Sequence, residues 1–200
     1  MPVTMSGWGK SMSHSLEKMM IAVFGHDRPG IVARVSLLLA EMGCNIEDAT
    51  QTILHGRFAG MFVVQPVQES LDRGQALRVL EGGFQGEDLT FWVSPMDEAA
   101  SPQSPQALTD PFVITTIGPD QLGLVAGVTG VLARFGVNIT ALRANVKTED
   151  ASQWVMIYEV DVPRSVDRGQ FRETLYDTAQ ELGQRLSLQH RDIFETVHRV

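Results

Sequence analysis

The chain has 200 residues, of which 44% are hydrophobic and 20% are charged, a composition typical of a soluble globular protein. Acidic side chains outnumber basic ones by 24 to 16, and the resulting net charge of −8 argues against direct binding to nucleic acid or to anionic membranes, which requires clustered Lys and Arg. The single cysteine excludes an internal disulfide, and no apolar run is long enough to form a membrane helix.

Residues 1–18 lack the apolar segment of a signal peptide, so we expect a flexible tail and a cytoplasmic protein. A first strand is predicted over Met20–Phe24. The helix that follows carries apolar residues at helical spacing up to Met42. Asp27 is expected to cap it, Pro29 to lie in its first turn, and Gly43 to end it.

A pair of strands is predicted next, over Asn45–Leu54 and Phe58–Val64. A second helix is expected over about Leu71–Glu81, where the run from Asp72 to Gln75 would form its cap and first turn. A last strand near Leu89–Val93 completes the unit, whose order of elements is βαββαβ. Residues 94–110 are rich in Pro, Ser and Ala without an apolar period, and are therefore predicted to be a linker.

The second half of the chain repeats the first. The stretch GHDRPGIVARV at residues 25–35 returns as GPDQLGLVAGV at residues 118–128, an offset of 120 − 27 = 93 for the aspartates. Strands are predicted over Phe112–Ile117, Asn138–Lys147, Gln153–Val162 and Leu186–His190. Helices are predicted over about 124–135 and 165–183, with Asp120 and Asp167 in the capping positions and Gly136 ending the first of them. A short turn over Arg191–Val200 is expected to carry Ile193, Phe194 and Val197 back onto the core.

The predicted fold is α+β, with two ferredoxin-like βαββαβ domains in tandem, each an antiparallel sheet with helices on one face. The expected organisation is a tail over residues 1–18, a first domain over 19–93, a linker over 94–110, and a second domain with a C-terminal extension over 111–200. Each domain is close to the lower size limit for a stable core, so pairing between domains is expected.

The order βαββαβ, the turn Asp-x-x-Gly-Ile/Leu-Val-Ala and the Gly-x-Asn-Ile that opens the second strand resemble the ACT-domain family. Two such domains in tandem resemble the glycine cleavage system transcriptional repressors. The resemblance implies a regulatory protein that binds a small amino acid, such as glycine or serine, at an interface between two ACT domains. It also implies a homodimer and a protein partner, such as a transcription activator.

The resemblance places the effector between the first strand–helix turn and the start of the second strand. In the first domain the implied ligand-binding residues are Asp27, Arg28, Pro29, Gly30, Ile31, Asn45, Ile46 and Glu47. In the second they are Asp120, Gln121, Leu122, Gly123, Leu124, Asn138, Ile139 and Thr140. A helix N-terminus presents free N–H groups to a carboxylate, and a glycine in the turn allows close approach by a ligand or by a neighbouring domain.

The sequence contains no nucleophile–base motif, no metal-ligand spacing and no dinucleotide fingerprint, so we expect a non-enzymatic protein without catalytic residues, metal or cofactor. Cys44 is expected to be a small, partly buried filler. Two alternatives remain. The domains could serve only as a ligand-free interaction or oligomerisation module, or a cluster of His26, Glu47 and Asp48 could carry an enzymatic activity.

Overall fold

The computed structural model describes residues 17–67, 71–96, 108–146 and 153–198. The chain divides into two compact units with the boundary between Ser101 and Pro102, and each unit is described by itself. The predicted N-terminal tail, up to residue 16, and residues 97–107 of the predicted linker lie outside the described residues.

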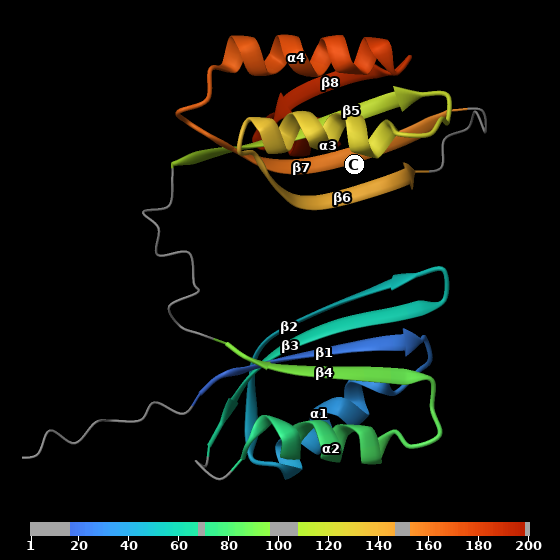
Figure 1. Cartoon of the computed structure of the whole chain (residues 1–200), viewed down its shortest axis with the longest axis vertical. Helices are drawn as coiled ribbons and strands as arrows, with labels where there is room; N and C mark the ends of the chain where they lie inside the picture. Colours follow the sequence, from blue (N-terminus) through green and yellow to red (C-terminus); the bar gives the residue numbers. More distant parts are fainter. Residues whose placement is uncertain (1–16, 68–70, 97–107, 147–152, 199–200) are drawn as a thin grey trace, which may run out of the picture. The chain divides into compact units, whose positions relative to one another are not determined.

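The first unit has the predicted order of elements. These are β1 (Met19–His26), α1 (Ile31–Glu41), β2 (Cys44–Leu54), β3 (Arg57–Pro66), α2 (Arg73–Gly83) and β4 (Leu89–Pro95). The strands form one antiparallel sheet in the order β2-β3-β1-β4, and α1 and α2 lie together on one face of it (Figure 1). The predicted fold of this unit is therefore confirmed.

Side chains that alternate between the two faces of the sheet build the first core. Ile21 and Val23 of β1 point toward the helices, whereas Ala22 and Phe24 between them point to the other face. The helices contribute one buried stripe each, with Val35 and Leu39 on α1 and Leu80 on α2. All five of the inward-facing side chains named here belong to a single apolar cluster.

The second unit repeats the same topology. Its elements are β5 (Thr109–Gly118), α3 (Leu124–Arg134), β6 (Asn138–Val146), β7 (Trp154–Pro163), α4 (Arg168–Glu181), β8 (Arg185–His190) and α5 (Arg191–His198). The sheet order is β6-β7-β5-β8, the counterpart of the first. A separate core lies between this sheet and the helices α3 and α4, centred on Ile114, Leu132, Tyr158 and Leu175.

The predicted signals at the second helix of each unit are confirmed. Asp72 is the N-cap of α2, where its carboxylate accepts the backbone N–H of Gln75 at 2.8 Å while the Gln75 side chain accepts the N–H of Asp72 at 3.0 Å. Asp167 caps α4 by accepting the N–H of Gln170 at 3.0 Å. Both helices therefore begin two to three residues later than the apolar pattern predicts. Gly43 and Gly136 follow the first helix of each unit with φ of 70° and 64°, as expected.

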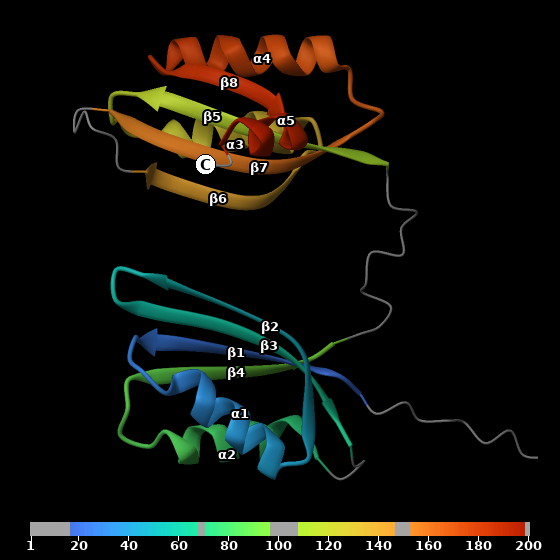
Figure 2. The same ribbon diagram turned by 180° about the vertical axis from the view of Figure 1, so that it is seen from behind.

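The C-terminal segment forms the helix α5, but it does not carry all three predicted side chains onto a core. Ile193 is 59% exposed, whereas Phe194 is half-buried, and nothing is described of the Val197 side chain. The views from the two sides show α5 and α3 on opposite faces of the second sheet (Figures 1 and 2). The prediction for Ile193 is wrong because α5 packs with one side only, and Ile193 lies on the outward side.

Candidate functional site

The turn between β1 and α1 differs from the prediction. Gly30, not Asp27, is the N-cap of α1, with a left-handed φ of 95°, and no side chain caps the helix. Gly123 takes the same place before α3, with φ of 89°. The predicted capping roles of Asp27 and Asp120 are therefore wrong, and Pro29 lies before the helix instead of in its first turn. A left-handed residue at this point redirects the chain, so that the aspartate three residues earlier is out of reach of the helix N–H groups.

The glycine at this position has a conformational reason. A Cβ added to Gly30 or Gly123 would meet no atom within 4 Å, so intramolecular crowding does not require glycine there. The positive φ does, because side chains other than glycine rarely adopt it. The space beside the turn stays open, and the first N–H groups of α1 have no side-chain acceptor.

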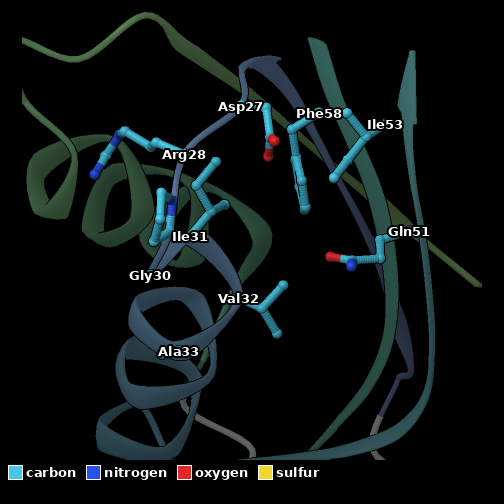
Figure 3. A pocket seen from close by; sticks show the side chains of 10 residues that line it. Asp27, Arg28, Gly30, Ile31, Val32, Ala33, Gln51, Ile53 and Phe58 are labelled. Carbon is cyan, nitrogen blue, oxygen red and sulfur yellow. The ribbon is translucent and has the colours of Figure 1, made fainter. Parts of the chain in front are cut away.

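This turn forms one side of a pocket. The pocket has a volume of about 370 Å³ and lies between the N-terminus of α1 and the distal part of β2 (Figure 3). Its lining consists of Asp27, Arg28, Pro29, Gly30, Ile31, Val32, Ala33, Gln51, Ile53 and Phe58. An aspartate, an amide, apolar walls and free helix N–H groups therefore surround one space.

The polar and apolar groups of the pocket are placed on different sides of it. The Asp27 carboxylate, from the turn after β1, and the Gln51 amide, from β2, both point into the space (Figure 3). Among the described residues, no hydrogen bond or ion pair engages either side chain. The side chains of Val32, Ile53 and Phe58 form an apolar wall between them.

Arg28 lines the pocket with its backbone side and directs its guanidinium away from Asp27 (Figure 3). Glu87 holds it there through an ion pair and also binds Arg34 at 3.0 Å. The ring of Phe84 lies under the guanidinium of Arg34, at 4.9 Å from its carbon to the ring centroid. Because Arg28 is engaged elsewhere, the Asp27 carboxylate faces the open space without an ion-pair partner among the described residues.

The predicted residues are only partly brought together. Asp27, Arg28, Pro29, Gly30 and Ile31 line the pocket, whereas Asn45, Ile46 and Glu47 do not. The direction of the chain explains this difference. Because α1 runs back along the sheet, β2 begins beside the C-terminal end of the helix. It reaches the N-terminus of the helix only about six residues after its start. Glu47 instead forms an ion pair with Lys18 at 2.7 Å.

Sequence reasoning missed Val32, Ala33, Gln51, Ile53 and Phe58 as pocket residues. Val32 and Ala33 lie within the repeated motif, where the apolar pattern indicates only a helix. Gln51 lies in the middle of β2, where the local sequence does not mark it as a site residue. In the structure it pairs with the buried Gly60 of β3. Recognising it requires the pairing of β2 with β3, which the sequence alone does not provide.

The second unit carries a different set of side chains around its turn. Gln121 donates to the backbone oxygen of Leu182 at 2.6 Å, Leu122 is fully exposed, and Leu124 is buried in the core. At the start of β6, Thr140 donates to the backbone oxygen of Glu159 at 3.2 Å, while Asn138 and Ile139 pair with Asp161 and Val160.

The register also identifies what replaces Gln51 in the second unit. Gln51 pairs with Gly60 in the first sheet, and Ala144 pairs with Met156 at the corresponding place in the second. Alanine offers neither the donor nor the acceptor of an amide. The second unit therefore has no amide at this place.

The cluster of His26, Glu47 and Asp48 is not assembled. His26 pairs with Arg57 at one end of the first sheet, whereas Asp48 pairs with Val63 near the other end. Six residues of strand separate the two places, roughly 20 Å. Asp48 also accepts the N–H of Ala49 at 2.8 Å. The three side chains therefore cannot act on one substrate.

Other reactive groups lie away from the pocket. Cys44 is buried in the first core, as expected, and burial raises the pKa of its thiol. Burial likewise raises the pKa of Tyr158 to about 12 in the second core. Among the described residues, no group of three or more His, Cys, Asp and Glu side chains could hold a metal ion, and no helix could span a membrane.

Comparison with known proteins agrees with this architecture. The ACT-domain family model matches twice, over residues 17–81 and 110–189. The chain belongs to the ACT-domain family. It carries two ACT domains in tandem, as the resemblance implied, and this confirms the predicted family.

Two curated relatives each match over about one domain of this chain. A UPF0237 protein of Methanopyrus kandleri is 36% identical over 89 residues, which cover 44% of this chain and 96% of the relative. A UPF0237 protein of Streptococcus mutans is 50% identical over 64 residues, covering 32% of this chain and 72% of the relative. Each of these ACT proteins therefore has the length of one unit.

Solved structures match across both units. A crystal structure of an unknown protein from Galdieria sulphuraria has a TM-score of 0.70 and 25% identity, and covers 87% of this chain and 98% of that one. The structure of a protein provisionally assigned as a glycine cleavage system transcriptional repressor has a TM-score of 0.60 and 23% identity, with 86% and 96% coverage. At that identity the second match establishes the fold alone.

Proposed function

We propose that this ACT protein is a non-enzymatic sensor, which binds a small amino acid in the pocket of its first domain and passes the signal to a partner protein. The observation that carries this proposal is the pocket beside Gly30, where free helix N–H groups, the Asp27 carboxylate and the Gln51 amide face one space. These are the groups that an amino acid requires.

The complementarity is chemical. The N-terminus of α1 offers N–H groups and partial positive charge to the carboxylate of the effector. Asp27 offers an anionic partner to its ammonium group, and Gln51 can bond a small polar side chain such as the hydroxyl of serine. Val32, Ile53 and Phe58 provide an apolar wall on the remaining side. The choice of glycine or serine rests on the likeness to the structure provisionally assigned as a glycine cleavage system transcriptional repressor.

The downstream role rests on the family. ACT domains are regulatory, and one structure with the same fold is provisionally assigned as a glycine cleavage system transcriptional repressor. We infer a cytoplasmic protein whose effector changes its fit to a partner, such as a transcription activator of amino-acid metabolism. The acidic net charge of −8 favours action through protein contact over direct contact with DNA. An effector can act in this way only if it binds the two states of the protein with different affinities.

The side chains of the second domain favour a different role for that domain. It lacks the amide of Gln51, and its turn directs Leu122 into solvent. We therefore assign it to scaffolding or partner contact. If neither domain binds an amino acid, the whole chain is the ligand-free interaction module that the sequence left open.

Effector binding is tested by a thermal-shift screen of the full chain against the twenty standard amino acids, followed by calorimetry. A ligand at a hundred times its Kd stabilises the native state by about 2.7 kcal/mol. Asp27→Asn and Gln51→Leu each remove one polar partner, and we expect either to raise the Kd at least tenfold, which corresponds to about 1.4 kcal/mol.

The matched control is Asp120→Asn, the same change at the equivalent position of the second domain, which should leave the Kd unchanged. If Asp120→Asn weakens binding and Asp27→Asn does not, the effector site lies in the second domain. If no amino acid stabilises the folded protein, the sensor function is wrong and the interaction-module alternative takes its place.

A further inference from the structure

A second cavity lies in the second unit, between α4 and the sheet. α4 runs alongside β8, the edge strand of this sheet, and contacts it (Figures 1 and 2). The cavity has a volume of about 170 Å³ and lies beside the first turns of α4. Its lining consists of Phe112 of β5, Leu188 of β8, and Arg168, Phe171 and Arg172 of α4. We call this space the arginine cavity, and it shares no residue with the pocket beside Gly30.

Three of the lining side chains of the arginine cavity are apolar. Phe171 belongs to the buried core of the unit, and Phe112 and Leu188 are partly buried against that core. These side chains offer carbon surface to a ligand and no hydrogen-bonding group. An apolar cavity of about 150 Å³ in a protein holds a molecule of the size of benzene. The arginine cavity, at about 170 Å³, therefore has room for one branched chain or ring of that size.

The two arginines bring positive charge to the same space. Arg168 and Arg172 lie four residues apart on α4, and therefore on one side of the helix, where like charges repel each other. Arg168 is also the first residue of α4, where the partial charge of the helix is positive and a cation is unfavourable. The guanidinium of Arg172 lies over the ring of Tyr176, at 5.5 Å from its carbon to the ring centroid. An anion bound between the two arginines would relieve both repulsions.

The neighbouring carboxylate of Asp110 neutralises only part of this charge. Asp110 is shared between two arginines, because it accepts Arg164 at 2.8 Å and the Nη2 of Arg168 at 2.9 Å. The Nη1 of Arg168 is buried and has no hydrogen-bond partner in the described part of the chain. Arg172 is exposed and forms no ion pair with any residue that the structure describes. The arginine cavity therefore has more guanidinium groups than anionic partners.

Comparison with the first unit shows that the fold does not require this charge. The capping aspartates align the second helices of the two units, so that Arg73 corresponds to Arg168 and Leu77 to Arg172. Leu77 is partly buried and packs against the first core. A leucine thus suffices at this place in one copy of the fold. The arginine of the second copy has its charge beside a cavity, where a packing role does not account for it.

We propose that the arginine cavity binds a small monocarboxylate with a branched or ring-shaped apolar body. The carboxylate binds the guanidinium groups of Arg168 and Arg172, whose planar donors match it in geometry. The apolar body packs on Phe112, Phe171 and Leu188. None of the lining residues is acidic, so an ammonium group has no partner there. The site therefore favours an acid without an amino group over the corresponding amino acid.

The arginine cavity uses neither strand–helix turn of the chain, so it stands independently of the proposed function. The test is an NMR titration of the ¹⁵N-labelled full chain with sodium 3-methylbutanoate at constant ionic strength. We expect a Kd in the millimolar range, with the largest changes in chemical shift at the amides of 168–172 and 187–189. A titration that leaves these amides unchanged would overturn the proposal, and it would leave the pocket beside Gly30 untested and intact.

Three further compounds separate the features of the ligand. Acetate keeps the charge without the branched chain, and 3-methylbutanamide keeps the chain without the charge. Valine is 3-methylbutanoate with an added ammonium group. Each should bind the arginine cavity at least tenfold more weakly than 3-methylbutanoate, which corresponds to at least 1.4 kcal/mol. Equal binding of the amide or of valine at the same amides would show that the site does not select an acid without an amino group.

A pair of variants assigns the charge that binds the ligand. Arg172→Leu introduces the residue of the first unit at an exposed position, and should raise the Kd for 3-methylbutanoate at least tenfold. Arg185→Leu is the matched control, because it removes an exposed arginine of β8 that points to the opposite face of the sheet from Leu188. It should leave the Kd unchanged. Far-UV circular dichroism checks the fold of both variants. An unchanged Kd in Arg172→Leu, or an equal rise in Arg185→Leu, would overturn the proposal.

Discussion

The aspartates of this chain show how one residue type takes different roles in similar surroundings. Asp72 and Asp167 close the N-termini of α2 and α4 through their side chains. Asp27 and Asp120 precede helices as well, but a left-handed glycine stands between them and the first turn. A helix with a capping side chain is thereby stabilised locally, whereas the first N–H groups of α1 have no side-chain acceptor.

This difference gives a prediction at the scale of the residue. Asp72→Ala should lower the free energy of unfolding by about 1 kcal/mol, because it removes a capping box. Asp27→Ala should change it by less than about 0.5 kcal/mol, because no cap is lost. Urea denaturation of both variants measures the two values. A larger loss for Asp27→Ala than for Asp72→Ala would show that the first aspartate has a structural role after all.

Two glycines of the repeated motif are explained by packing. A Cβ on Gly25 would collide with the backbone oxygen of Asp88, and a Cβ on Gly118 would collide with Gln184 and the backbone of Gly183. In both units the loop before the last strand crosses directly over the end of the first strand. The two copies therefore have glycine at these positions because they share a fold, and these glycines carry no information on ligand binding.

At the scale of the element, the helix α5 distinguishes the two copies. Arg191, at its start, approaches Asp161 and Glu159 of β7 at 3.8 Å each. The helix covers a face of the second sheet that the first sheet leaves open.

The packing of α5 is tested by two neighbouring substitutions. Phe194→Ala should lower the free energy of unfolding of the second unit by about 2 kcal/mol, because a half-buried aromatic ring is removed. Ile193→Ala should change it by less than about 0.5 kcal/mol, because that side chain is in solvent. Thermal unfolding followed by circular dichroism compares them. Equal losses would mean that α5 packs in a different orientation.

At the scale of the whole molecule, two separate cores hold the chain. Each sheet buries its own cluster, and Leu39 of the first corresponds to Leu132 of the second, both fully buried. The clusters share no residue. A loss of packing in one core should therefore leave the interior of the other unchanged.

Calorimetry of Leu39→Ala and Leu132→Ala tests this independence. Each substitution should destabilise its own unit by about 2–5 kcal/mol and lower one transition. In backgrounds that keep only one of the three tryptophans, with the other two replaced by Phe, the fluorescence of Trp92 reports the first unit and that of Trp154 the second. We expect Leu39→Ala to shift the Trp92 transition alone and Leu132→Ala to shift the Trp154 transition alone. A single transition that moves equally in both variants would show that the units unfold as one.

The amino-acid sequence by itself determined the repeat, the order of elements and the fold, because apolar periodicity and helix-ending glycines act within a few residues of chain. It also determined the caps at Asp72 and Asp167 and half of the pocket, the half formed by the repeated turn. Only the tertiary structure decided the rest. The register of β2 brought Gln51 and Ile53 to the turn and carried Asn45 and Glu47 away from it, and the left-handed glycines removed Asp27 from its predicted cap. The physical reason is that strand register and chain direction depend on contacts between distant segments, which local patterns do not encode.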